Sequence, residues 1–146
     1  MELIDEGMCF ICGRNNPIGL KAEFEIDAEN LRLRGRFTPK REHEGYKGIM
    51  HGGLASALLD EAMVKLLWEV GIPAVSASLQ IRLLKPVRVG EQLIIEGWVV
   101  SNKGRIIDTS AELRDEAGTV LARADGRCVR IESKEASGET RHRQQE

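Results

Sequence analysis

Apolar and charged residues alternate in two short stretches near the start of the chain. Ala22, Phe24 and Ile26 are separated by charged residues, and Leu31 and Leu33 resume the alternation after the polar sequence DAEN. Alternation with a period of two is typical of strands that bury one face. The pattern therefore predicts an antiparallel hairpin with its turn at DAEN.

A long apolar segment follows. Between Leu54 and Val70 the apolar residues are spaced so that they lie nearly all the way round a helix. Such a helix is buried on most of its faces, unlike a surface helix with one apolar stripe. Gly71 and Pro73 are typical signals for its end.

The rest of the ordered chain reads as four strands, over residues 74–84, 92–101, 105–115 and 119–131, separated by turns. In the first of them the alternation predicts one shared face for Val75, Ala77, Leu79, Ile81 and Leu83. One helix cannot cover both faces of a sheet, so we expect an α+β fold in which a curved antiparallel β-sheet wraps around one long buried helix. Uncovered sheet edges favour pairing with a second copy, so we expect at least a homodimer.

The chain has 146 residues, a length typical of one domain. We expect a single domain over residues 1–131, including an N-terminal turn segment at 1–19. Residues 132–146 contain one apolar residue, Ala136, and we expect this polar tail to be disordered.

Charge and hydropathy exclude several classes of protein. The net charge is −2, whereas general nucleic-acid binders need an excess of lysine and arginine. No apolar run reaches the roughly 18 to 20 residues of a membrane span. The first ten residues have neither the basic nor the apolar region of a signal peptide. We expect a cytoplasmic protein without nucleic-acid or membrane partners.

Two of the three cysteines, Cys9 and Cys12, have the spacing of half a zinc knuckle. No second cysteine pair follows, and the three histidines are scattered along the chain. We therefore expect no metal, no disulfide framework and small thiols that pack inward. A zinc module built on this pair is the minor alternative.

The sequence GIMHGGLASALLDEAM, followed by SASLQIRLLKPVRVGE and SNKGRIIDTSAELRDEAGTVLARADG, resembles the hotdog-fold acyl-CoA thioesterases of the PaaI-like group. The N-terminal CFICGRNNPIGL is similar to that of many members, and the resemblance covers residues 9–131. It implies hydrolysis of acyl-CoA to a free acid and coenzyme A, with no cofactor, in a dimer or a dimer of dimers. The alternative is a non-catalytic module of the same fold that binds or senses acyl-CoA.

His51, Gly52 and Gly53 stand where the predicted helix begins. Backbone N–H groups in a first helical turn have no intrahelical partner, and the peptide dipoles favour negative charge there. The resemblance implies that Gly52 or Gly53 donates its N–H to the thioester oxyanion, and we expect His51 to orient the loop. The plainer interpretation is that the glycines only permit a tight turn.

Asp60 follows His51 by nine residues, or ~13.5 Å and half a turn of helix. One chain therefore cannot bring both groups to the same carbonyl, and a site that uses both must be shared between two antiparallel copies. Asp60 can act as the nucleophile or as the general base that activates water. Its neighbour Glu61 is the rival acid, and the family pattern favours Asp60. A carboxylate that is merely exposed or hydrogen-bonded is the plainer alternative.

Other site residues follow from the resemblance. Ser78 matches a position where some relatives have a serine or threonine that helps to place the water. Gly45 stands where some relatives have an asparagine or glutamine that assists the reaction. If that side chain is required, this chain uses a different helper or is slow. Residues in turns are expected to contact the coenzyme A phosphates, namely Lys85, Arg88, Lys103, Gly104 and Arg105. Met50 is expected to line the acyl pocket.

Overall fold

The computed structural model describes residues 1–131 as six strands, one α-helix and one short 3-10 helix. The elements are β1 (Glu23–Asp27), β2 (Arg32–Phe37), η1 (Arg41–His43), α1 (Gly52–Glu69), β3 (Ala74–Leu83), β4 (Leu93–Lys103), β5 (Ile106–Arg114) and β6 (Val120–Arg130). The expected tail at 132–146 lies outside the described residues. The predicted hairpin, helix and four following strands are all present, and the short η1 was not predicted.

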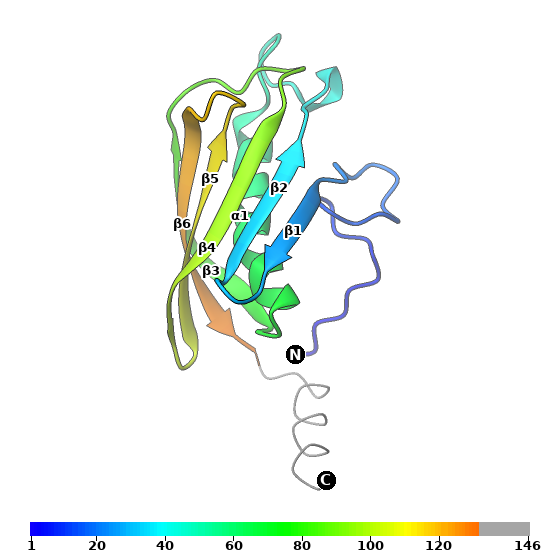
Figure 1. The fold of residues 1–146 in the computed structure, drawn as a ribbon. Coiled ribbons are helices and arrows are strands. Elements are labelled where there is room, and N and C mark those ends of the chain that lie inside the picture. Colours follow the sequence, from blue (N-terminus) through cyan, green and yellow to red (C-terminus); the bar gives the residue numbers. More distant parts are fainter. Residues whose placement is uncertain (132–146) are drawn as a thin grey trace, which may run out of the picture.

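The six strands form one sheet in the order β1-β2-β4-β5-β6-β3, and every neighbouring pair is antiparallel. The sheet curves around α1, which runs along its concave face (Figure 1). The predicted α+β architecture, a curved antiparallel sheet wrapped around one helix, is confirmed. β1 and β3 are the two edge strands.

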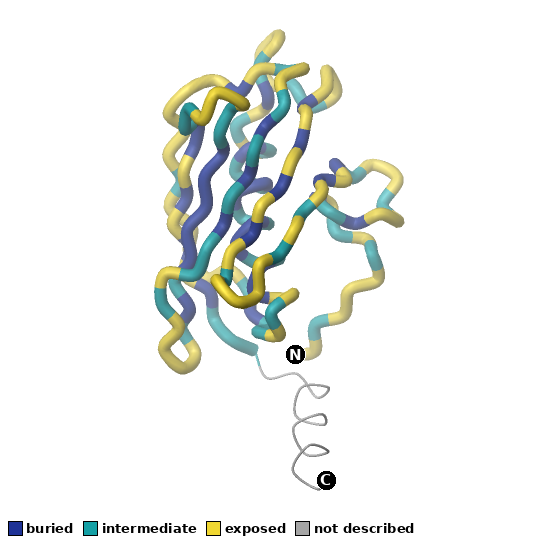
Figure 2. The backbone as a smooth tube through the Cα atoms, viewed as in Figure 1, coloured by how far each residue is buried: buried dark blue, intermediate teal, exposed yellow. Residues whose placement is uncertain are grey.

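α1 is held against the sheet by apolar burial. Seven of its residues are buried, namely Ala55, Leu58, Leu59, Ala62, Met63, Leu66 and Leu67. The helix approaches the sheet closely at Gly97 and Gly126, where an added Cβ would lie 2.7 Å from the Ala62 carbonyl oxygen and 2.9 Å from the Met63 sulfur. Figure 2 shows the resulting buried centre of the sheet, with exposed residues in the loops and at alternating positions of strands such as β2. Close packing of this kind fixes the position of α1, and hence of every side chain on it.

β3 contains a bulge that changes which residues face the helix. The pairing with β6 shifts between Ser76, opposite Cys128, and Ser78, opposite Arg127. A bulge adds one unpaired residue, so the alternation of faces is reversed beyond it. Ser76 faces α1, where it contacts Asp60. Beyond the bulge, Leu79 pairs with Gly126, which lies against Met63 of the helix, so Leu79 is the next residue on the helix side. The predicted single face from Val75 to Leu83 is therefore wrong on the N-terminal side of the bulge.

The N-terminal segment folds back on itself before β1 begins. The Gly13 N–H donates to the Cys9 carbonyl at 2.8 Å, and the Leu20 N–H donates to the Phe10 carbonyl at 2.9 Å. Ile11 and Leu20 are buried in the main core. The segment lies beside β1 (Figure 1). These contacts place the Cys9–Cys12 turn against the body of the domain.

No helix within residues 1–131 combines the length and the apolar content that a bilayer crossing requires. The cytoplasmic location stays a prediction.

Candidate active site

His51 is the N-cap of α1, and its side chain caps the helix itself. The His51 Nδ1 accepts the Gly53 N–H at 2.9 Å. N-cap side chains commonly accept an N–H of the first turn in this way. Because Nδ1 is the acceptor, it carries no proton in this arrangement. The Gly53 N–H is thus already used within the chain.

The Gly52 N–H differs from its neighbour. Within residues 1–131 no backbone or side-chain acceptor pairs with it. Gly52 lines a hollow of about 550 Å³ together with Gly45, Met50 and Lys85. The first helical N–H groups attract negative charge. Of the two glycines expected from the sequence, the geometry favours Gly52 as the donor to an oxyanion.

Asp60 lies half-buried in the middle of α1, beside a second groove. Its Oδ1 accepts the Ser76 hydroxyl at 2.6 Å. Asp60 and Ser76 line a groove of about 760 Å³ that also includes Trp68 and Met8 of the N-terminal segment. A short hydrogen bond from a hydroxyl fixes one carboxylate oxygen and leaves Oδ2 free of any protein hydrogen bond among the described residues.

Ser78, the serine expected from the sequence, lies on the opposite face of β3. It is exposed, pairs with Arg127, and lines a hollow on the outer face of the sheet near Trp98. The structure places Ser76 beside Asp60 instead. The expectation of Ser78 came from the resemblance to the family, and only the pairing of β3 with β6 reveals the bulge that turns Ser76 toward α1.

Glu61 lines the groove next to Asp60 and has a different hydrogen-bond partner. One of its carboxylate oxygens lies 2.9 Å from the Cys12 sulfur, whose thiol donates the hydrogen bond. Burial, and after it this hydrogen bond with Glu61, raises the pKa of the Cys12 thiol well above its usual range. Asp60 and Glu61 line the same groove but have different hydrogen-bond partners, Ser76 and Cys12.

The groups of the expected site lie at two places on the chain. Gly52 precedes Asp60 by eight residues, or ~12 Å along the helix axis, and the two line different hollows. The Gly52 N–H and the Asp60 carboxylate therefore do not converge within one copy of the chain. The edge of β3 opposite its β6 neighbour carries no strand within residues 1–131, and the apolar Leu79 and Leu83 on this strand are exposed.

The expected phosphate contacts also divide into two groups. Lys85 lines the hollow at Gly52, and Arg88 forms a backbone bridge with Ile49 of the same hollow. The turn of Lys103, Gly104 and Arg105 lies at the other end of the sheet, where the Arg130 N–H donates to the Arg105 carbonyl. The ten residues of β3 separate the two ends by ~30 Å.

Gly45 lies directly against the helix start. An added Cβ at this position would be 3.3 Å from the His51 Cα. A larger side chain therefore requires His51 to shift by a few tenths of an ångström. The chain has no polar side chain here to assist a carbonyl, and Ser76 is the hydroxyl that the fold supplies at Asp60.

The chain was compared with known protein families. A model described as the thioesterase superfamily matches residues 47–122, which contain the start of α1, Asp60 and Ser76. The chain belongs to the thioesterase superfamily. The resemblance inferred from the sequence is thereby confirmed at the level of family, and the solved structures confirm the hotdog fold.

Individual relatives of this thioesterase-superfamily chain agree. Acyl-coenzyme A thioesterase 13 of Homo sapiens is 33% identical over 86 residues, which cover 57% of this chain and 61% of the relative. A solved thioesterase superfamily protein, RHA08564, has a TM-score of 0.78 at 26% identity, covering 84% of this chain and 60% of that one. The PaaI protein of E. coli, from the phenylacetic acid degradation operon, has a TM-score of 0.73 at 20% identity, covering 78% of this chain and 82% of that protein.

Proposed function

We propose that this protein hydrolyses acyl-CoA thioesters to the free acid and coenzyme A. The observation that carries the proposal is Asp60, an acid on an apolar helix that is held by Ser76 at 2.6 Å and lines a groove. A carboxylate in such surroundings costs stability unless it is paired or used. Membership of the thioesterase superfamily and the printed name of the human relative, acyl-coenzyme A thioesterase 13, support the same activity.

The proposed site is shared between two copies of the chain. Antiparallel pairing of two β3 edges covers the exposed Leu79 and Leu83 and runs the two α1 helices in opposite directions. Gly52 of one copy then approaches Asp60 of the other, which a single chain cannot achieve. A twofold axis produces two such sites per dimer. The functional unit is a homodimer, or a dimer of such dimers.

In the proposed reaction the thioester carbonyl oxygen accepts the Gly52 N–H of one copy. Asp60 of the other copy either attacks the carbonyl carbon with Oδ2 or removes a proton from a water that attacks it. Attack turns the carbonyl oxygen into an oxyanion, which the Gly52 N–H and the helix dipole stabilise. Collapse of this intermediate breaks the C–S bond and releases the coenzyme A thiolate, which takes a proton.

The two forms of the reaction differ in the origin of one oxygen atom. Direct attack forms a mixed anhydride, and water that cleaves it at the Asp60 carbonyl leaves an Asp60 oxygen in the acid product. With Asp60 as general base, the new oxygen of the acid comes from water. After a single turnover in ¹⁸O-water, mass spectrometry that finds ¹⁸O in the Asp60 peptide identifies direct attack. Label in the acid alone fits a general base or cleavage of the anhydride at its acyl carbon.

Coenzyme A phosphates require cations near the mouth of the site. In the antiparallel dimer, the Lys103–Arg105 turn of one copy lies at the same end as Lys85 and Arg88 of the other. We assign these four cations, together with the Gly104 backbone, to the nucleotide end of the substrate. Met50, which lines the hollow at Gly52, is assigned to the acyl end.

The experiment that tests the function is release of free thiol from short, medium, long and aromatic acyl-CoAs. The wild type is expected to release thiol from at least one class, and Asp60→Ala to lose at least about 100-fold in rate. Glu69→Gln, on the exposed part of the same helix, is the matched control. Binding of acyl-CoA without release by the wild type would instead favour the non-catalytic module.

A further inference from the structure

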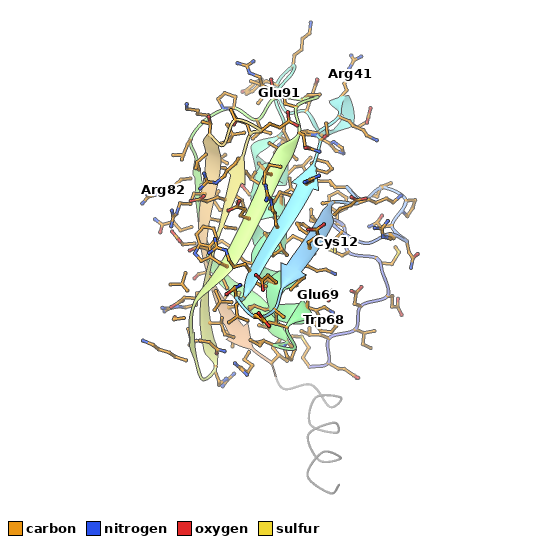
Figure 3. The ribbon with its side chains drawn as sticks, viewed as in Figure 1. Cys12, Arg41, Trp68, Glu69, Arg82 and Glu91 are labelled. Atoms are coloured by element: carbon orange, nitrogen blue, oxygen red, sulfur yellow. The ribbon has the colours of Figure 1, made fainter. Side chains whose placement is uncertain are left out.

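A cluster of three metal-ligating side chains lines the same groove as Asp60 and has no part in the proposed hydrolysis. The sulfurs of Cys9 and Cys12 and a carboxylate oxygen of Glu61 all lie within 4.8 Å of one another, and all three residues are half-buried. The cysteines come from the N-terminal turn and Glu61 from the middle of α1. Figure 3 shows Cys12 on this N-terminal segment, alongside β1. From these contacts we propose that Cys9, Cys12 and Glu61 bind a zinc ion that clamps the N-terminal segment to α1.

The distances match the requirements of zinc. Zinc binds thiolate sulfur at about 2.3 Å and carboxylate oxygen at about 2.0–2.2 Å, so tetrahedral ligand atoms lie roughly 3.4–3.8 Å apart. Atoms within 4.8 Å of one another need to move by only about 1 Å to reach that arrangement. Two thiolates also select zinc over magnesium and calcium, which prefer oxygen ligands.

The orientation of Glu61 indicates a ligand. Lys65 is four residues further along α1, in the position where a glutamate normally forms an ion pair with it. Lys65 pairs with Glu69 at 2.9 Å instead, and Glu61 accepts from the Cys12 thiol at 2.9 Å. A thiol is a weak donor, so the carboxylate has a poorer partner than the ammonium nearby. The contact of Glu61 with Cys12 rather than with Lys65 is explained if the Glu61 carboxylate and the two thiols bind the same cation.

The backbone of the N-terminal turn supports the same conclusion. The Gly13 N–H donates to the Cys9 carbonyl at 2.8 Å, which closes a tight turn around both cysteines. An added Cβ at Gly13 would lie 2.4 Å from the Cys9 nitrogen, so the turn requires glycine directly after Cys12. The turn presents both sulfurs to the same point on α1.

The charge of the cluster is partly compensated. A zinc ion with two thiolates and one carboxylate has a net charge of −1, and the Lys65 ammonium near Cys12, although paired with Glu69, reduces the cost of that charge. Binding of zinc releases the two thiol protons to solvent and involves no change of oxidation state. A water molecule completes the tetrahedron.

The sequence shows only half of a zinc knuckle, because the third proposed ligand is neither a cysteine nor a histidine. Glu61 is 49 residues beyond Cys12, and no spacing rule connects the two. The metal-free interpretation of Cys9 and Cys12 is replaced by this proposal, which is independent of the hydrolytic reaction.

The test is cobalt and zinc binding by the full chain under reducing conditions, after removal of metal with a chelator. Cobalt is expected to bind at one equivalent per chain, with the charge-transfer absorption of two thiolates and the visible bands of a tetrahedral site, and zinc to displace it. Cys9→Ser and Cys12→Ser should each halve the thiolate absorption. Each should also weaken binding at least about 100-fold, since loss of a residue that merely orients a ligand already costs about 10–100-fold.

Matched variants keep the test specific. Glu61→Gln should weaken cobalt binding and shift the visible bands, whereas Cys128→Ala should leave both unchanged. The proposal is overturned if no thiolate absorption develops, if Cys128→Ala abolishes it, or if Glu61→Gln binds cobalt as the wild type does. A disulfide between Cys9 and Cys12 that persists under the reducing conditions of the test would overturn the proposal as well. None of these measurements depends on thioesterase activity.

Discussion

Ser76 donates a 2.6 Å hydrogen bond to Asp60 across the space between β3 and α1. This contact exists because a bulge after Ser76 turns its side chain toward the helix. The catalytic carboxylate of the proposed mechanism is therefore oriented by an edge strand. The same strand offers the surface on which two copies are proposed to meet, so the orientation of Asp60 and the pairing of the copies are linked.

Ser76→Ala should reduce kcat about tenfold, because one hydrogen bond to a charged group contributes about 1.5 kcal/mol. Ser78→Ala is the control and should leave kcat unchanged, since Ser78 faces the outer hollow. Steady-state kinetics on the best acyl-CoA checks both. The reverse order of effects would show that Ser78 is the serine of the site.

The Gly52 N–H can be removed without breaking the helix. Gly52 is the first residue of α1, a position that tolerates proline, and the extended His51 backbone (φ −56°, ψ 129°) suits the residue before a proline. Gly52→Pro should lower kcat by about 10²–10³-fold, as loss of an oxyanion donor does. Gly52→Ala has the same Cβ, close to the Leu83 methyl, but keeps the N–H and should retain most of the activity. Equal losses in the two variants would argue for a steric effect.

His51→Ala should destabilise the fold through the lost helix cap. Removal of an N-cap acceptor costs about 1 kcal/mol, which for a domain of this size lowers Tm by about 2–4 °C. His51→Asn, which can still accept the Gly53 N–H, should recover most of the loss. Thermal unfolding measures the change. An unaltered Tm in His51→Ala would show that the cap contributes nothing.

Cys12 should be a slow nucleophile when no metal is bound. Burial, followed by the contact with Glu61, raises its pKa, so the thiolate fraction at pH 8 is lower in the folded chain than in the unfolded one. Iodoacetamide labelling at Cys12 should therefore be slower in the native protein than in urea. Its rate should also continue to rise with pH after the rate in urea has levelled off. Glu61→Gln removes a negative charge and should accelerate labelling, as followed by mass spectrometry of the Cys12 peptide.

Much of the fold follows from hydrophobic periodicity. The alternation at Phe24 and Ile26 predicts β1, and the continuous apolar segment after Leu54 predicts a helix buried on most sides. These signals suffice because each element buries its own apolar residues against the others. They also lead to the curved sheet around one helix, which the structure confirms.

The details of the site depend on tertiary contacts that the sequence pattern does not reveal. Alternation places Ser78 and Leu79 correctly relative to each other, but the bulge that brings Ser76 to Asp60 leaves no mark in the sequence. The choice between Gly52 and Gly53 depends on the His51 side chain, which occupies one N–H and leaves the other. The contact of Glu61 with Cys12 is a tertiary contact between residues far apart in the chain. Local pattern gives the candidates, and packing decides among them.

The central claim is that each active site combines Gly52 of one copy with Asp60 of another. Mixing two inactive variants tests it: Gly52→Pro and Asp60→Ala chains are unfolded together, refolded and assayed for thiol release. Random pairing makes half of the dimers mixed, each with one intact site of two, so activity should return to about a quarter of the wild-type value. Each variant refolded alone should remain inactive. A mixture that forms mixed dimers, shown by differently tagged chains, but stays as inactive as its components would contradict the shared site.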